Sequence, residues 1–247
     1  MSPSVSNTEH IDNGSILNPG LEGTGPVRLH NVPTFTDKHE ERQWAKKHMA
    51  GAFRIFAKFG FADGASGHIN LRNPLKPDCF WINPYAMHFS KIRANDLVLV
   101  NEEGHPVEPT HRKVNAAGFI IHSSIHKARP DINAACHVHA PQARAWSTFG
   151  KPIEMLNQDS FMFYDDLAVY EGFGERHSSK SWHNYMRRNN GRGCRFFLSL
   201  LRGFKITVGD EEAEYTKRCS GSPVCMYMQF LPDYNAIVEE TSGTVLQ

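Results

Sequence analysis

The sequence lacks the features that mark secreted, membrane-spanning or disulfide-stabilised proteins. Its five cysteines are scattered and form no C-x-x-C pair, so neither a structural zinc ribbon nor a disulfide framework is indicated. No apolar run approaches the roughly 18 residues that a membrane-spanning helix needs. The residues after Met1 are polar and do not resemble a secretory signal. We therefore expect a reducing, cytoplasmic location and no membrane span.

An excess of charge of one sign is also missing. The formal net charge of the 247 residues is +1, and acidic and basic residues are mixed along the chain. Nothing in this balance indicates a nucleic-acid partner. The contents of 40% hydrophobic and 21% charged residues are typical of a globular protein.

The chain divides into a polar arm and one domain. Residues 1–35 are rich in Ser, Asn, Gly and Pro, which predicts a flexible N-terminal arm, and residues 36–247 form the domain. Within the domain we expect a helix from Thr36-Asp37 to about Gly60, because acidic residues favour the first turn. Further helices are expected at 115–128 and 141–149. Residues 64–72 are expected to form a turn that runs into a strand, and further strands are expected at 80–82, 97–100 and 132–138. Alternating short strands and helices predict a layered α/β domain.

The strongest local signal for chemistry is the pair His137 and His139. Residues i and i+2 of a strand point to the same side, so the two imidazoles can share one cation. Two histidines at this spacing also occur by chance in proteins that bind no metal. The pair follows an apolar strand and precedes Pro141 and a helix, so it lies at a strand's carboxyl end, where α/β proteins often have their sites.

Two more histidines share one face of the preceding predicted helix. His122 and His126 are four residues apart, so either could approach the same cation, orient a ligand or carry a proton. The alternative is that one packs against the sheet and the other is solvated. We favour packing or solvation for His126 and retain His122 as a candidate catalytic residue.

The turn from Ser66 to Asn70 is a candidate anion-binding site. Gly67 allows backbone N–H groups to approach a phosphate or carboxylate, and Ser66 and Asn70 add polar side chains. Arg72 and Lys91 could supply positive charge. Most turns of this composition only reverse the chain, and that interpretation stays open.

Several segments together resemble the class II aldolase/adducin superfamily. They are Gly64–Arg72, Asp96–Val100, Val114–His126, Ala128–Asp131 and His137–Pro141, in the family's order and spacing. Residues 151–174 resemble fungal-type members, and residues 209–246 resemble the family's C-terminal tail more weakly.

This resemblance implies a three-layer α/β/α sandwich around a central, mainly antiparallel sheet, commonly assembled as a tetramer. It implies a divalent metal ion held by three histidines, zinc first, with iron or manganese as alternatives. His137 and His139 match two of these ligands, and Ser66, Gly67 and Asn70 match the anion-binding turn. The implied reaction is cleavage or isomerisation of a small hydroxy-carbonyl substrate such as a sugar phosphate.

The sequence departs from the family pattern in two places. Gly118 stands where the aldolases have an acid/base glutamate. The Asn-His-Gly turn that carries the third metal histidine is absent from the chain, so we expect a truncated C-terminal part. Residues 175–205 match no part of the family, although His177 or His183 could replace the lost ligand.

Three functions are therefore open at this point. The first is a metal-dependent lyase- or isomerase-like enzyme with a small-molecule substrate. The second is a non-catalytic, adducin-like head domain that binds a cytoskeletal or other protein partner. The third is an inactive isoform, in which a missing segment leaves apolar surface and a strand edge uncovered.

Overall fold

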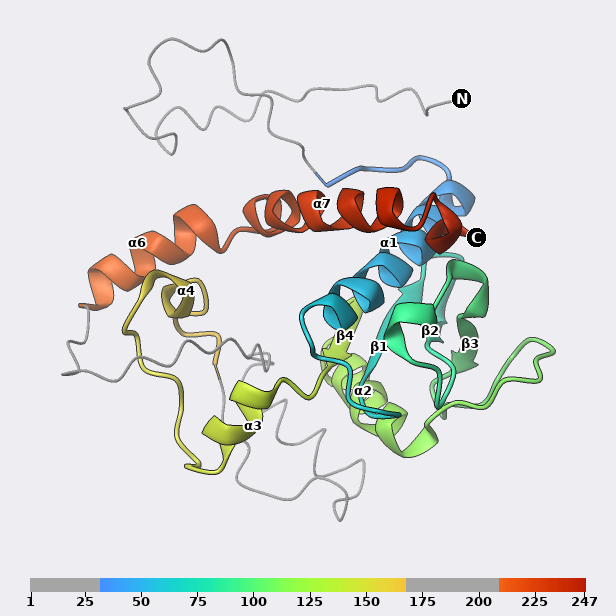
Figure 1. Ribbon diagram of the computed structural model, residues 1–247, viewed down its shortest axis with the longest axis horizontal. Coiled ribbons are helices and arrows are strands. Elements are labelled where there is room, and N and C mark those ends of the chain that lie inside the picture. Colours follow the sequence, from blue (N-terminus) through green and yellow to red (C-terminus); the bar gives the residue numbers. More distant parts are fainter. Residues whose placement is uncertain (1–31, 168–208) are drawn as a thin grey trace, which may run out of the picture.

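The computed structural model describes residues 32–167 and 209–247 (Figure 1). Its strands are β1 (His68–Asn73), β2 (Lys76–Ile82), β3 (Val98–Asn101) and β4 (Ala134–His137). Its helices are α1 (Lys38–Lys58), α2 (Ala116–Ala128), α3 (Pro141–Ser147), α4 (Gln158–Phe161), α6 (Asp210–Ser220) and α7 (Pro223–Glu240), with 3-10 turns η1 (Phe89–Lys91), η2 (Ala94–Asp96) and η4 (Thr244–Leu246). The expectations for residues 1–31 and 175–205 lie outside the described part.

The four described strands form one antiparallel sheet in the order β3-β2-β1-β4. Strand β1 lies in the middle and pairs with β2 on one side and β4 on the other. Its register places His68 opposite His137 and Asn70 opposite Ala135. Because paired residues of antiparallel strands point to the same face, this register decides which side chains of β1 and β4 meet.

Helix α1 covers one face of this sheet. Met49 and Phe53 of α1 pack with Ile69, Trp81 and Leu99, which come from three neighbouring strands. The strand residues alternate with residues of the opposite face, as the two-residue repeat of a strand requires. Phe53 is completely buried, and its ring meets that of Phe89 edge to face at 4.8 Å.

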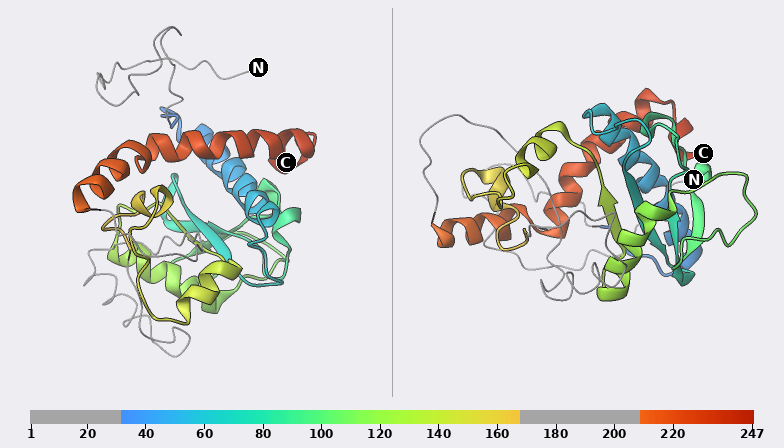
Figure 2. Two further views of the ribbon diagram at one scale, coloured as in Figure 1. Left: turned by 60° about the vertical axis from the view of Figure 1, so that its left-hand side comes forward. Right: turned by 90° about the horizontal axis from the view of Figure 1, so that it is seen from below.

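Helix α2 lies over the opposite face, so the sheet is enclosed between helices (Figure 2). Phe119 of α2 packs against Phe80, Ile82 and Val100, and all four side chains are fully buried. The expected α/β/α layering around an antiparallel sheet is therefore confirmed. His68 and Asn70 of β1 share this second face with Phe80, and they point toward α2.

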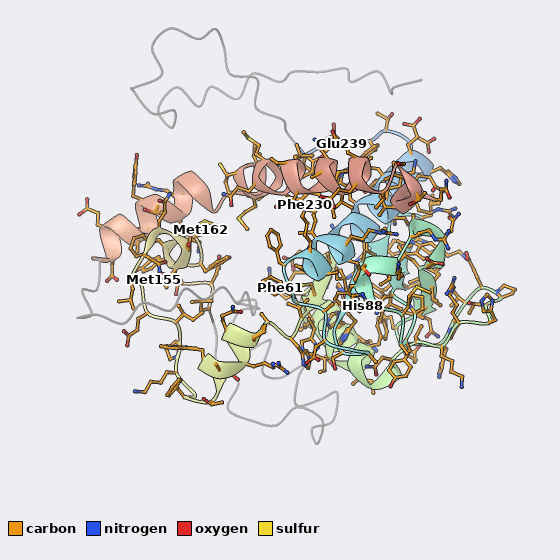
Figure 3. The ribbon with its side chains drawn as sticks, viewed as in Figure 1. Phe61, His88, Met155, Met162, Phe230 and Glu239 are labelled. Atoms are coloured by element: carbon orange, nitrogen blue, oxygen red, sulfur yellow. The ribbon has the colours of Figure 1, made fainter. Side chains whose placement is uncertain are left out.

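Helix α7 crosses over α1 on the side away from the sheet (Figures 1 and 2). Tyr234 and Ile237 of α7 pack with Ala50 and Ile55 of α1. Figure 3 shows Phe230 on the side of α7 that faces α1, whereas Glu239 lies on the outer side. No described helix is long and apolar enough to cross a membrane.

Local chemistry explains most of the element boundaries. Asp37 caps α1 by accepting a hydrogen bond from the backbone N–H of His39, as expected from the acidic start of this helix. The strand expected from Ile132 begins only at Ala134. The reason is that the Ile132 carbonyl accepts hydrogen bonds from the side chains of His126 and Arg72 instead of a sheet partner.

Candidate metal centre

The two histidines expected to bind a cation lie at the end of β4. His137 is the last residue of this strand, whereas His139 follows just beyond it, so the expectation that both belong to one strand is corrected. Their ring centroids are 4.8 Å apart, and Val138 between them packs against the core on the sheet's α1 side. The two rings therefore lie close together, although only His137 belongs to the strand. Burial, followed by the neighbouring His139, lowers the pKa of His137, so its imidazole is neutral and can act as a nitrogen donor.

His68 lies directly across the β1–β4 pair from His137. Their ring centroids are 5.1 Å apart, and the planes are close to perpendicular. The Nε2–H of His68 donates a hydrogen bond to the Gly118 carbonyl oxygen at 3.0 Å, because a carbonyl can only accept. Burial, and then the nearby His137, lower the pKa of His68 to about 4.

Helix α2 adds His122 to this group. The ring centroids of His122 and His68 are 4.2 Å apart. The Nδ1 of His122 lies 2.6 Å from Asn70 Oδ1, an acceptor, so this nitrogen carries the proton and Nε2 carries the lone pair. Burial, followed by the imidazoles of His68 and His137, holds the pKa of His122 well below its usual value.

Asn70 connects His122 to His126 through a buried chain of hydrogen bonds. Its Nδ2 donates to His126 Nε2 at 2.8 Å, and His126 Nδ1 lies 3.0 Å from the Ile132 carbonyl. Both ring nitrogens of His126 are thus occupied, and the ring stacks on Phe80. His126 has the packing environment expected for it, whereas Asn70 is fully buried and holds histidines in place.

The turn at Ser66 and Gly67 is shaped by close packing. Gly67 has a φ of +88°, and an added Cβ would lie 3.0 Å from both the His137 carbonyl oxygen and the Phe89 ring. Only glycine suits this conformation and space. Arg72 is held by the carbonyls of Pro77 and Ile132 and lies over the Phe80 ring, so its charge is directed away from the turn.

The described residues fit part of a cation site. As they stand, they include no group of three or more His, Cys, Asp or Glu side chains that could hold a metal ion. Two imidazoles that share a tetrahedral cation have ring centres roughly 5 Å apart, because metal–nitrogen distances are ~2.0–2.1 Å. His137 and His139 match this spacing. The buried Nδ1 of His68 has no hydrogen-bond partner within the described ranges, so its lone pair is not engaged.

Sequence reasoning did not identify His68 as a site residue. The available signal was the alternation of His68 and Asn70, which places both on the same face of β1. The importance of this alternation depends on the pairing of β1 with β4 and on the position of α2. The candidates His177 and His183 for a third ligand lie outside the described residues.

Comparisons with known proteins agree with the fold. The chain is 40% identical over 144 residues to the Meiotically up-regulated gene 14 protein of Schizosaccharomyces pombe, covering 58% of this chain and 56% of that protein. It is 39% identical over 214 residues to Decarboxylase NovR of Streptomyces niveus, covering 86% of this chain and 78% of that protein. The chain thus spans little more than half of the first relative's length.

Among solved structures, L-fuculose 1-phosphate aldolase from Glaciozyma antarctica PI12 matches with a TM-score of 0.72 at 29% identity. The match covers 87% of this chain and 96% of that one. The family model described as Class II Aldolase and Adducin N-terminal domain matches residues 47–203, more than half of the sequence. The chain therefore belongs to the class II aldolase and adducin N-terminal domain family.

Proposed function

We propose that this protein is a metal-dependent lyase- or isomerase-like enzyme that acts on a small hydroxy-carbonyl metabolite, such as a sugar phosphate. The supporting observation is that His68 of β1, His122 of α2, His137 of β4 and His139 just after β4 come together. Imidazoles gathered in this way can bind a divalent cation through a ring nitrogen and can move a proton.

His137 and His139 would hold the cation, with zinc as the first choice and iron or manganese as alternatives. When bound, a divalent cation supplies Lewis-acid stabilisation of negative charge on a substrate oxygen. His122 would accept or return a proton at Nε2, because Asn70 holds the proton of the other ring nitrogen. The backbone at Ser66 and Gly67 would bind the substrate's anionic group.

The names of the relatives support this class of reaction. A decarboxylase and an aldolase both break a carbon–carbon bond, and both match this chain closely enough for the comparison to bear on its chemistry. The shared demand is stabilisation of the electron pair left on carbon after the bond breaks. Because Gly118 stands where the aldolases have an acid/base glutamate, another residue must carry the proton. The next histidine along α2 is His122.

Purified protein tests this proposal through its metal content and its activity. The protein is loaded with Zn²⁺, Mn²⁺ or Fe²⁺ and given sugar phosphates for aldol cleavage and oxo or hydroxy acids for decarboxylation. We expect one bound cation per chain and turnover of one of these two substrate classes. H137A and H139A should lose both, and H105A, at an exposed histidine outside the site, should lose neither. Absence of cation binding in the unsubstituted protein would refute the proposal.

A second candidate function is that of an adducin-like head domain without catalysis. It is favoured by Gly118, which removes the carboxylate from the histidine group. Co-sedimentation with actin filaments, in the absence of turnover on any substrate above, would support it. We also propose that the chain forms a homo-oligomer, and multi-angle light scattering of the purified protein tests this assembly.

A further inference from the structure

The side of α1 that faces the sheet carries two cations in the first half of the helix. Arg42 and Lys46 are four residues apart and continue the row of Met49 and Phe53, which pack with Trp81 in the core. Lys46 Nζ lies 4.3 Å from the centre of the Trp81 ring. Two half-buried cations therefore lie on the α1 side of the sheet, whereas the histidine group lies on the side that α2 covers.

Two N–H groups of these side chains are buried without an acceptor. Trp81 is only 4% exposed, and neither its Nε1 nor the buried Nε of Arg42 donates a hydrogen bond within the described part of the chain. Indole and guanidinium nitrogens can only donate, so no change of tautomer satisfies them. A buried donor without an acceptor is unfavourable and points to a bound water or ion. Oxygen atoms of a bound molecule would satisfy both groups.

The charges around Lys46 favour an anion as this molecule. Burial, followed by the charge of Arg42, lowers the pKa of Lys46, and the exposed Glu108 offsets only part of this effect. The ion pairs of the described residues include neither Arg42 nor Lys46. An anion bound beside the two cations would reduce their mutual repulsion and favour the charged form of Lys46.

We propose that Arg42, Lys46 and Trp81 bind a small tetrahedral oxyanion, either inorganic phosphate or a phosphate monoester, between α1 and β2. The donors belong to three separate side chains, and a phosphate group presents oxygens in several directions, whereas a carboxylate has two oxygens in one plane. This site does not rest on the proposed function, because the histidine group lies on the opposite face of the sheet and none of its residues takes part.

Isothermal titration calorimetry with inorganic phosphate and with glycerol phosphate tests this site. We expect binding to the unsubstituted protein and at least about tenfold weaker binding to R42Q and K46Q, the loss expected for a charge-assisted hydrogen bond. The control K47Q removes the same charge about 100° around α1 and should change the affinity by less than about twofold. The tighter of the two ligands identifies the source of the phosphate group. Failure of both ligands to bind would overturn the inference, and so would equal binding to all four proteins, which would indicate another site such as the turn at Ser66 and Gly67.

The indole N–H of Trp81 reports on the same site in a protein whose charged residues are unchanged. In protein labelled with ¹⁵N-tryptophan, phosphate should shift the NMR signal of this group, which is identified by its loss in W81F. The indole N–H of Trp146 already donates to the Lys151 carbonyl, so its signal should stay in place. A Trp81 signal that does not respond to phosphate would overturn the inference. Circular dichroism of R42Q and K46Q verifies that affinities are compared between folded proteins.

Discussion

His68 and His137 face each other across the pairing of β1 with β4, with their ring centroids 5.1 Å apart. Their positions differ by sixty-nine residues in the sequence. The antiparallel register alone places both imidazoles on the face that α2 covers. The histidine group therefore depends on correct pairing of β4, the last strand of the described sheet, and a slip of one residue would turn His137 to the opposite face.

Replacing Asn70 should destabilise the fold through its two histidine partners. In N70A, His122 Nδ1–H and His126 Nε2 both lose a buried partner, and each unsatisfied group costs about 1–3 kcal/mol. We expect the free energy of unfolding, measured in urea, to fall by about 2–6 kcal/mol. The control N95A replaces an exposed asparagine and should change the free energy of unfolding by less than about 0.5 kcal/mol. Equal stability of N70A and N95A would contradict the hydrogen-bond chain.

The contact between Gly118 and His68 predicts opposite effects of one substitution in two backgrounds. Alanine is favoured over glycine inside a helix by about 1 kcal/mol, but in G118A the new Cβ meets the His68 ring, and overpacking costs about 1–3 kcal/mol. We expect G118A to destabilise the protein when His68 is present and to stabilise it relative to H68A alone. Chemical denaturation of the unsubstituted protein, G118A, H68A and the double variant G118A/H68A measures this coupling. Additive effects would show that the two residues do not compete for space.

The packing of His48 predicts loss of stability in mild acid. Its ring stacks between Trp44 and Tyr234, and burial lowers its pKa below 6.5, partly offset by the hydrogen bond to the Trp44 carbonyl. Between the folded pKa and 6.5 the unfolded chain binds more protons, so the stability present above pH 6.5 decreases as the pH falls. Urea unfolding at pH 7.5 and 5.5 should show a smaller decrease for H48F than for the unsubstituted protein. An identical decrease in both would exclude His48 as a contributor.

If the protein binds the proposed metal ion, removal of that ion should lower its thermal stability. A ligand present at one hundred times its dissociation constant stabilises the folded state by about 2.7 kcal/mol. For a chain of this size, that corresponds to a rise in Tm of about 5–10 °C. Scanning calorimetry with chelator and then with added Zn²⁺ measures the change. The double variant H137A/H139A provides the control and should show no response to Zn²⁺.

Local sequence signals predicted the main elements because each depends on near neighbours. Asp37 and the acidic residues after it determine where α1 begins, and Pro141 determines where the helix after β4 begins. The spacing of His137 and His139 predicted that both would lie on one side of a strand, but β4 ends at His137 and His139 lies beyond it. The assignment of Asn70 to an anion-binding turn stays a prediction, and the local pattern did not indicate the two histidine partners of this side chain.

The sequence by itself determined the helices α1, α2 and α3, most strand positions, the family resemblance and the histidine pair, because these follow from spacing over a few residues. It did not predict α4, α6 or α7. Only the tertiary structure decided that His68 joins His137, that Asn70 orients His122, and that Gly118 makes room for an imidazole. These three relationships depend on strand register and on how α2 packs against the sheet. Both are set by burial of apolar side chains that are distant in the sequence, so no local pattern contains them.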